Sequence, residues 1–427
     1  MTNPLSPYTK PEKINGSEPI EDRDISHSIS ADRERNRIAW LRLKLIPGLG
    51  NRSVLRLLEV FGSAEAVLAA GLEELRKTDV VRDRPLRALA SKKYIRDPES
   101  EWSYLKSRNF RLVCIGDEDY PANLAKIPDP PAVLFASGPL LPRDLVSIAV
   151  VGSRYASPAG ILFAEKLSSD LASCGLTIIS GLALGIDSAA HRGALKAQGR
   201  TLAVLGCGLD VNYPSINADL RQEIGQAGAL LTEFLPGTPP SSGNFPSRNR
   251  IISGLSLGVV VVEAAERSGS LITARFALEQ GREVFAVPGV AQSMRSKGTH
   301  RLIKEGAKLV EDAEDILEEI RPLIRSAQHS PPPLFEGEQE RDLCSPISKG
   351  EQGRSSSPPF PKGGQGGFER PYSPEEAALL KILDKVPKHI DEIAQEANMP
   401  VQRIAAILLE LELRGLVSQL PGKYFIS

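Results

Sequence analysis

The hydrophobic pattern of the chain is most regular between Val146 and Val310, where short apolar runs alternate with amphipathic stretches. The runs lie near residues 147–151, 177–180, 201–205, 229–232, 257–262, 283–287 and 308–310. Continuous apolar runs of strand length, separated by helices of 10–15 residues, are typical of a parallel sheet covered on both faces. The pattern predicts a doubly wound, Rossmann-like α/β fold, whose ligands bind beyond the carboxyl ends of the strands.

Two further apolar runs precede this region and are separated by turn-forming residues. Residues 111–116 and residues 132–136 have the length of strands, and Pro128-Asp129-Pro130-Pro131 leads into the second of them. We expect both strands to extend the sheet that starts at Val146. The extended α/β domain is therefore placed at residues 109–325.

The segment before this domain divides into a polar part and a helical part. Residues 1–33 are polar and rich in Asp, Glu, Ser and Pro, which predicts disorder. Residues 34–108 show helical apolar spacing around Ile46-Pro47-Gly48-Leu49-Gly50, a turn that resembles a helix-hairpin-helix. Such a turn can bind a DNA phosphate through backbone amides. A plain turn in a small helical bundle is the alternative, favoured because no basic cluster is apparent beside the turn.

The C-terminal third contains a linker and a small domain. Residues 326–372 are dense in Pro, Gly and Ser, which predicts a flexible linker. Residues 373–427 show three helical stretches and a hairpin, the pattern of a winged helix. This domain has six basic and eight acidic residues, a net charge of −2. Because phosphate neutralisation drives DNA binding, docking to a protein or to another part of the chain is at least as compatible with the winged helix.

Composition narrows the class of protein further. The 427 residues have a formal net charge of −1, so the overall charge does not indicate nucleic-acid binding. The four cysteines are far apart without a CxxC pair, which fits a reducing compartment and argues against a zinc site. No apolar run approaches the ~18 residues of a membrane span. We expect a soluble, cytoplasmic protein that needs no membrane and no cofactor.

Four loops at the carboxyl end of the predicted sheet combine small residues with helix starts, and three of them contribute an arginine. Free amides at helix starts attract anions, and arginine suits bidentate phosphate contacts. Together the loops predict a pocket for a nucleotide or for the phosphates of a strand. Tyr155 and Phe245 are the best candidates for base stacking. The predicted DNA- or phosphate-binding residues are Gly152, Ser153, Arg154, Tyr155, Gly181, Gly185, Asp187, Phe245, Arg248, Asn249, Arg250, Ser268, Gly269, Ser270 and Arg275.

The chain lacks the motifs that several classes of enzyme need. The chain has no GxxxxGK[ST] motif, and Val211 breaks the dinucleotide-binding pattern that Gly206-Cys207-Gly208 begins. His191 stands alone on a predicted helix, and Glu263 ends a predicted strand without an acid or metal partner. We therefore assign no catalytic or metal-binding residue.

The four loops, and the blocks around them, closely resemble the motifs of the DNA-processing protein A family (DprA, also called Smf). The quoted blocks are Gly152–Arg154, Ser180–Asp187, Phe245–Ser256 and Ser268–Ala274. The resemblance covers about residues 36–325, and the flanking helical and winged-helix domains match the family's usual layout. It implies a homodimer that binds single-stranded DNA and loads the RecA recombinase onto it during natural transformation, without catalysis. The segment Lys297–Val310, with Leu302, Ile303 and Leu309, is expected near the dimer and RecA contacts.

Two other functions remain open at this point. One is a nucleotide-binding enzyme, because related Rossmann-like folds include nucleotide glycoside hydrolases. Their PGGxGTxxE-type motif is not found, and the nearest stretch is Pro288-Gly289-Val290. The other is a transcription regulator that reads duplex DNA through its winged helix.

Overall fold

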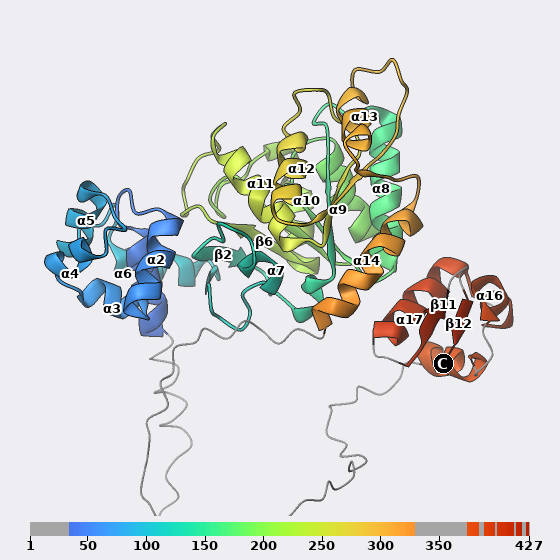
Figure 1. Ribbon diagram of the computed structural model, residues 1–427, viewed down its shortest axis with the longest axis horizontal. Coiled ribbons are helices and arrows are strands. Elements are labelled where there is room, and N and C mark those ends of the chain that lie inside the picture. Colours follow the sequence, from blue (N-terminus) through green and yellow to red (C-terminus); the bar gives the residue numbers. More distant parts are fainter. Residues whose placement is uncertain are drawn as a thin grey trace, which may run out of the picture.

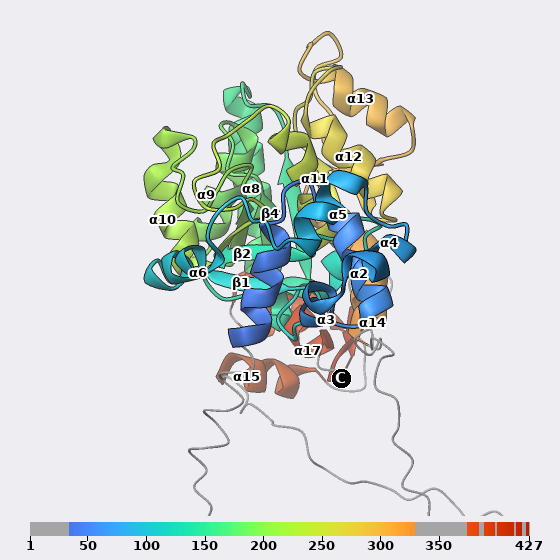
Figure 2. The same ribbon diagram turned by 90° about the vertical axis from the view of Figure 1, so that its left-hand side faces the viewer.

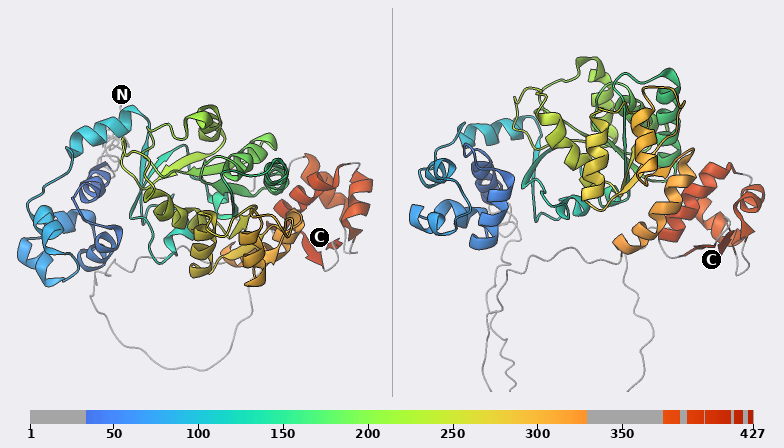
Figure 3. Two further views of the ribbon diagram at one scale, coloured as in Figure 1. Left: turned by 90° about the horizontal axis from the view of Figure 1, so that it is seen from above. Right: turned by 45° about the horizontal axis from the view of Figure 1, so that its top comes forward.

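The structure is a computed structural model that describes residues 34–328, 374–383, 388–397, 399–413, 416–420 and 424–426. These residues form an N-terminal group of helices, a central α/β unit and a small C-terminal unit, with the α/β unit in the middle (Figures 1 and 3). The segment 1–33 lies outside the described residues, and so does most of the predicted linker 326–372. Residues 326–328 are described, and they complete a helix instead of starting the linker.

Short helices build the N-terminal part around a core of buried leucines, among them Leu41, Leu57 and Leu89. A turn at Gly48, whose φ is +79°, joins the first helix, residues 34–44, to α2. Figure 2 shows these helices in front of the edge of the central sheet. The labelled helices are α2 (Asn51–Phe61), α3 (Ala64–Ala69), α4 (Leu72–Lys77), α5 (Asp83–Ala90) and α6 (Pro98–Ser107).

The central unit contains a nine-stranded sheet with the order β1-β2-β6-β5-β4-β3-β7-β8-β9. All neighbours from β6 to β9 are parallel, whereas β1 and β2 run antiparallel at one edge. The doubly wound sheet and its two-strand extension are therefore confirmed. The strands are β1 (Arg111–Cys114), β2 (Val133–Ser137), β3 (Ser147–Val151), β4 (Thr177–Ser180), β5 (Thr201–Val204), β6 (Ala229–Thr232), β7 (Gly258–Val261), β8 (Glu283–Ala286) and β9 (Lys308–Leu309).

Helices cover both faces of the sheet. Successive side chains of a strand point to opposite sides, so the apolar strands present an apolar surface on each face. Ile148 and Val150 pack with α8, α9 and α14, while Ala149 and Val151 pack with α11 and α12. Burial on both faces explains why strand interiors such as Ile148–Val151 are apolar. The helices are α7 (Ala122–Ala125), α8 (Pro158–Ser173), α9 (Ile186–Lys196), α10 (Ala218–Ala227), α11 (Asn244–Leu255), α12 (Ser270–Glu279), α13 (Lys297–Lys304) and α14 (Ala313–Gln328), with 3-10 turns η1 (Pro142–Leu145) and η2 (Ser215–Asn217).

The C-terminal unit is a winged helix, as predicted, with its own core around Leu379, Ile393, Leu408 and Phe425. Its strands form a small sheet of order β10-β12-β11. The third helix, α17, lies against α8 of the central unit. The elements are α15 (Pro374–Ile382), β10 (Lys388–His389), α16 (Ile390–Ala397), α17 (Val401–Leu413), β11 (Ser418–Leu420) and β12 (Tyr424–Ile426). Among the described residues, no helix has both the length and the apolar character to cross a membrane.

Candidate nucleic-acid interface

The strand order reverses at β3, which lies between β4 and β7, although β7 follows it by more than a hundred residues in the chain. Such a switch point leaves a crevice at the carboxyl ends of the strands. A cleft of about 720 Å³ opens there. It is lined by the loop after β3, the loop after β4, the start of α11 and the loop after β7. The three loops predicted after β3, β4 and β7 therefore meet in one place with the block around Arg248, which lies within α11 and not in the loop expected before that helix.

Glycines permit the close packing of these loops. Gly185 has a φ of +75°, and a Cβ at this position would collide with the carbonyl oxygen of Ser153. A Cβ on Gly152 would lie 2.6 Å from Ile186 Cγ1, and one on Gly181 would overlap the Arg248 guanidinium. Gly185 thus lets backbone approach backbone, and Gly152 and Gly181 leave room for the Ile186 and Arg248 side chains.

The floor of the cleft is a buried pair of opposite charges. Arg248 donates from Nη1 to the carbonyl oxygens of Gly181, at 2.8 Å, and Val204. The Asp187 carboxylate accepts from the amides of Gly181, at 3.1 Å, and Ala183, at 3.4 Å. Burial lowers the pKa of Arg248 to about 10 and raises the pKa of Asp187, while each charge opposes the other's shift. Arg248 and Asp187 therefore fix the loop after β4 from below.

An aromatic and cationic wall stands above this floor. The Arg154 guanidinium lies 4.9 Å from the centroid of the Phe245 ring. The centroid of the Tyr213 ring lies 5.8 Å from the centroid of the Phe245 ring, and the two ring planes are tilted by 35°. Tyr155 is 83% exposed, and its carbonyl oxygen accepts from Arg295 Nε at 3.1 Å. Arg154, Tyr155, Tyr213 and Phe245 also line an adjoining cavity of about 150 Å³.

The loop after β7 completes the opposite rim. The Ser268 and Ser270 hydroxyls are 2.8 Å apart, and the carbonyl of Gly269 accepts from Asn249 Nδ2 at 3.3 Å. Arg267 is exposed on the same rim, and among the described residues it has no ion-pair partner. Hydroxyls and a free guanidinium suit an anionic ligand.

Two predicted arginines lie outside the cleft. Arg250 is buried, with Nη2 2.6 Å from Glu233 Oε2 and Nη1 2.6 Å from the carbonyl oxygen of Asp129. Residues two apart on a helix point about 200° apart, so Arg250 faces away when Arg248 faces the cleft. Arg275 is exposed and its Nε lies 3.7 Å from Glu279 on the same helix. The arginine-rich block thus divides between the cleft and the structural core.

Sequence reasoning missed Tyr213 and Arg267. Tyr213 belongs to the loop after β5, whose Gly206-Cys207-Gly208 was set aside because Val211 breaks the dinucleotide-binding pattern, and its 39% exposure beside Phe245 is visible only in the structure. Arg267 directly precedes the predicted Ser268–Ser270 block, so including the neighbours of each motif would have found it.

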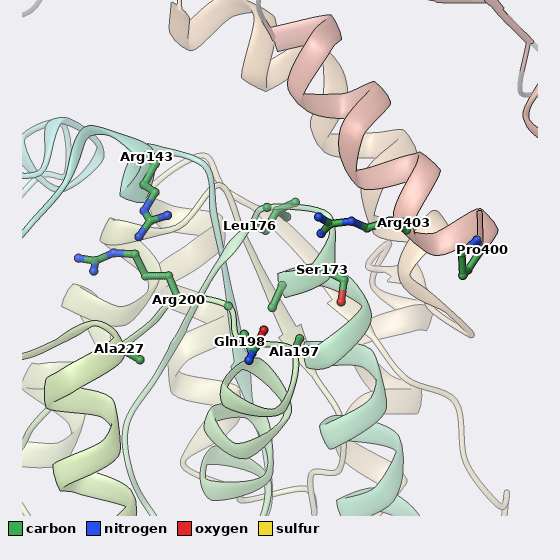
Figure 4. Close-up of a pocket in the computed structure, with 12 residues that line it drawn as sticks. Arg143, Ser173, Leu176, Ala197, Gln198, Arg200, Ala227, Pro400 and Arg403 are labelled. Carbon is green, nitrogen blue, oxygen red and sulfur yellow. The ribbon is translucent and has the colours of Figure 1, made fainter. Parts of the chain in front are cut away.

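A second cavity, of about 500 Å³, lies between α17 and the amino ends of β4 and β5. In Figure 4, Arg143 points toward Arg200, and Arg403 of α17 points toward Leu176. Arg200 pairs with Asp144 at 2.8 Å, and Arg403 pairs with Glu375 at 2.8 Å, so two of its three arginines are neutralised. Ligands of open α/β sheets bind at the opposite, carboxyl ends. We therefore place the candidate site in the cleft at the switch point.

The described residues contain no cluster of His, Cys, Asp and Glu side chains that could hold a metal ion. The cleft offers instead arginines, hydroxyls, exposed aromatic rings and tight glycine turns. A Rossmann-like fold with such a cleft is typical of the class of proteins that bind a phosphate-bearing ligand.

Comparison with known proteins identifies the family. Residues 111–321 match the family model of DNA recombination-mediator protein A, and residues 368–423 match the DprA winged helix domain. The chain is 38% identical to Protein Smf of Escherichia coli over 90% of this chain and 94% of that protein. It is 42% identical to the DNA processing protein DprA of Streptococcus pneumoniae over 64% of this chain and 94% of that protein.

The solved structures agree with the sequence matches. The X-ray structure of DprA from Streptococcus pneumoniae has a TM-score of 0.57 at 41% identity, covering 66% of this chain and 95% of that chain. The chain belongs to the DprA/Smf family of DNA-processing proteins, which confirms the resemblance of the loop motifs.

Proposed function

We propose that this protein binds single-stranded DNA in the cleft at the switch point and loads RecA onto the bound strand. The observation that carries the proposal is the combination of Arg154 with the rings of Tyr155, Tyr213 and Phe245, the first two of them exposed, above the floor formed by Arg248 and Asp187. Sequence-neutral binding of single strands uses basic groups along the backbone and aromatic rings for the bases. Family membership supports the role in DNA processing.

Within this proposal the predicted residues have two kinds of role. Ser153, Arg154, Asn249, Ser268, Gly269 and Ser270 border the open cleft and are assigned to the phosphates, with Tyr155 and Phe245 assigned to the bases. Gly152, Gly181, Gly185, Asp187 and Arg248 hold the loops in place. Arg250 and Arg275 receive no contact with DNA.

The alternative of a nucleotide hydrolase has no positioned acid in the cleft to support it. Asp187 is the carboxylate that lines the cleft, and two amides and Arg248 engage it. Glu263 accepts from the amide and hydroxyl of Ser157, at 2.9 and 2.5 Å, where it caps α8. We assign no catalytic step and propose a cytoplasmic protein that binds DNA.

Self-association is also part of the proposal, through the free edge at β9 and the neighbouring α13. Leu309 is 40% exposed on this edge strand, which is available for pairing. Leu302 and Val310, which the sequence suggested for the same contact, are buried in the protein's own core. Light scattering tests this point, since a pure monomer at tens of micromolar protein would contradict it.

The experiment that tests the function has two stages. Fluorescence anisotropy with a labelled oligothymidylate and a matched duplex measures binding, and we expect a clear preference for the single strand. A RecA-filament assay on strands precoated with a single-strand-binding protein then measures loading, and we expect faster filament formation. Preference for a specific duplex, lost on removing residues 374–427, would favour a winged-helix regulator instead.

A further inference from the structure

Positive charge is concentrated outside the family's α/β domain. Residues 34–108 contain 16 Lys and Arg against 10 Asp and Glu, a net charge of +6, whereas residues 146–322 have 17 against 18. Most of the excess falls on residues 82–96, which contain six basic residues and one acidic residue. We call these residues the basic segment. Its basic members are Arg82, Arg84, Arg87, Lys92, Lys93 and Arg96.

Most of these cations are free to meet an anionic ligand. Arg82, Arg84, Lys92 and Lys93 are exposed, and within the described part of the chain none has an ion-pair partner. Only two members are paired, Arg87 with Asp83 at 3.9 Å and Arg96 with Glu101 at 3.3 Å. Unpaired cations on one short segment form a local positive field that attracts polyanions.

The backbone of the basic segment is held in place. Helix α5 forms its first half, and the amide of Ile95 donates to the carbonyl oxygen of Leu45 at 3.0 Å. Ile95 itself is 54% exposed between the basic side chains. An ordered segment loses less conformational entropy on binding than a flexible one.

The basic segment is also joined to the wall of the cleft. Arg96 Nη1 donates to the carbonyl oxygen of Pro236 at 2.6 Å. The neighbouring amide of Gly237 donates to Asp210, which also accepts from Tyr104 of α6 at 3.0 Å. Ser241 and Ser242, a few residues further on, line the cleft. Ser241 follows Gly237 by four positions, and four extended residues span at most about 14 Å. This is about the length of four stacked nucleotides at 3.4 Å each.

We propose that the basic segment is a second binding surface for the phosphates of the same single strand that occupies the cleft. This inference rests on the proposed function and deepens it by extending the DNA footprint onto the N-terminal helices. It also corrects the sequence analysis, which found no basic cluster beside the Pro47–Gly50 turn. Gly48 of that turn lies against Pro85, at the start of α5 and inside the basic segment.

The side chains of the basic segment, and not the backbone of the Pro47–Gly50 turn, make the proposed contact with the phosphates. Asn51, at the start of α2, donates to Glu233 at 3.0 Å, so this helix start faces the central unit. The turn therefore helps to join the two parts of the protein. The four unpaired cations remain available for phosphates.

The test compares two triple variants of the full chain with oligothymidylates of two lengths. Arg84→Gln/Lys92→Gln/Lys93→Gln removes three charges from the basic segment. Lys77→Gln/Lys166→Gln/Arg192→Gln removes three exposed and unpaired charges from α4, α8 and α9 as a matched control. An oligonucleotide of ~6 nucleotides occupies the cleft alone, and one of ~25 nucleotides reaches both surfaces.

We expect the basic-segment variant to bind the short strand within twofold of the unmodified chain, and to bind the long strand at least tenfold more weakly. Three lost contacts should reduce the salt slope for the long strand by about 2, at 0.7 per phosphate. The control variant should match the unmodified chain for both lengths. As a second result, we expect the bound long strand to protect Lys92 and Lys93 from chemical acylation, whereas the short strand should not protect them.

Two outcomes would overturn the inference while leaving the proposed function intact. One is equal long-strand binding by the basic-segment variant and the unmodified chain. The other is an equal loss in the control variant, which would indicate a general effect of net charge. If an acidic protein and not the long strand protected Lys92 and Lys93, the segment would be a protein-docking surface. Failure of the unmodified chain to bind either strand would refute the proposed function itself.

Discussion

Replacing Arg154 by alanine should weaken single-strand binding strongly and leave the fold almost unchanged. Arg154 is exposed beside the cleft, so truncation removes little packing apart from the Phe245 contact and should change the free energy of unfolding by no more than about 1 kcal/mol. A charge-assisted contact with a phosphate contributes about 1.5–3 kcal/mol. The stacking of its guanidinium on Phe245 at 4.9 Å, about 0.5–1 kcal/mol at an exposed site, also orients the ring toward the DNA.

The loss of the phosphate contact, about 1.5–3 kcal/mol, corresponds to a roughly 10- to 150-fold rise in the Kd for oligothymidylate. Fluorescence anisotropy across a salt series measures it, and the salt slope should fall by about 0.7. Arg154→Lys should recover part of the affinity because it keeps the charge without the planar fork. Arg275→Ala is the control, since Arg275 is exposed outside the cleft. An unchanged Kd and slope for Arg154→Ala would refute the assignment of the cleft.

Three further predictions concern parts of the protein away from the rim. Arg250→Met leaves the buried Glu233 with the Asn51 amide but without the Arg250 charge, so thermal unfolding should reveal a loss of about 3–5 kcal/mol, with oligonucleotide affinity unchanged for the folded protein. Burial lowers the pKa of His191 to about 3 from 6.5, so this histidine stabilises the fold above pH 6.5 and costs about 1.4 kcal/mol per pH unit as the pH falls below 6.5 toward 3. His191→Gln should reduce the pH dependence of denaturant-induced unfolding in that window by one proton, and an unchanged slope would contradict the assignment. A chain truncated after residue 328 should keep most of its affinity for single strands and most RecA loading, because the cleft is complete without the winged helix; normal binding without loading would make the winged helix essential.

The sheet could be predicted from the sequence because its strands are buried on both faces. Ile148 and Val150 contact one layer of helices, and Ala149 and Val151 contact the other, so no polar residue interrupts the apolar run. The loops after β3, β4 and β7 followed from the same pattern, since each comes directly after a strand, whereas the block around Arg248 lies within α11. The end of α14 could not be predicted from the sequence, because residues 326–328 continue the helix into a stretch whose composition suggested a linker.

The membership of the site could be predicted only in part. Arg248 and Arg250 look equivalent in the sequence, but helix geometry turns the first to the cleft and the second to Glu233. Tyr213 lies beside Phe245 although it comes from the loop after β5, five residues beyond Gly206-Cys207-Gly208. The basic segment was overlooked because its residues follow the Pro47–Gly50 turn by more than thirty positions. Each of these relations depends on tertiary packing and not on local spacing.

The most direct test of single-strand binding in the cleft is photo-crosslinking of the full chain to an oligonucleotide containing 4-thiothymidine, followed by mass spectrometry of the crosslinked peptides. Tyr155, Tyr213 and Phe245 line the cleft. We predict that the principal crosslinks fall on peptides containing these three residues, and that Arg154→Ala reduces their yield. Efficient binding with crosslinks confined to the winged helix, or elsewhere outside the cleft and the basic segment, would contradict the account.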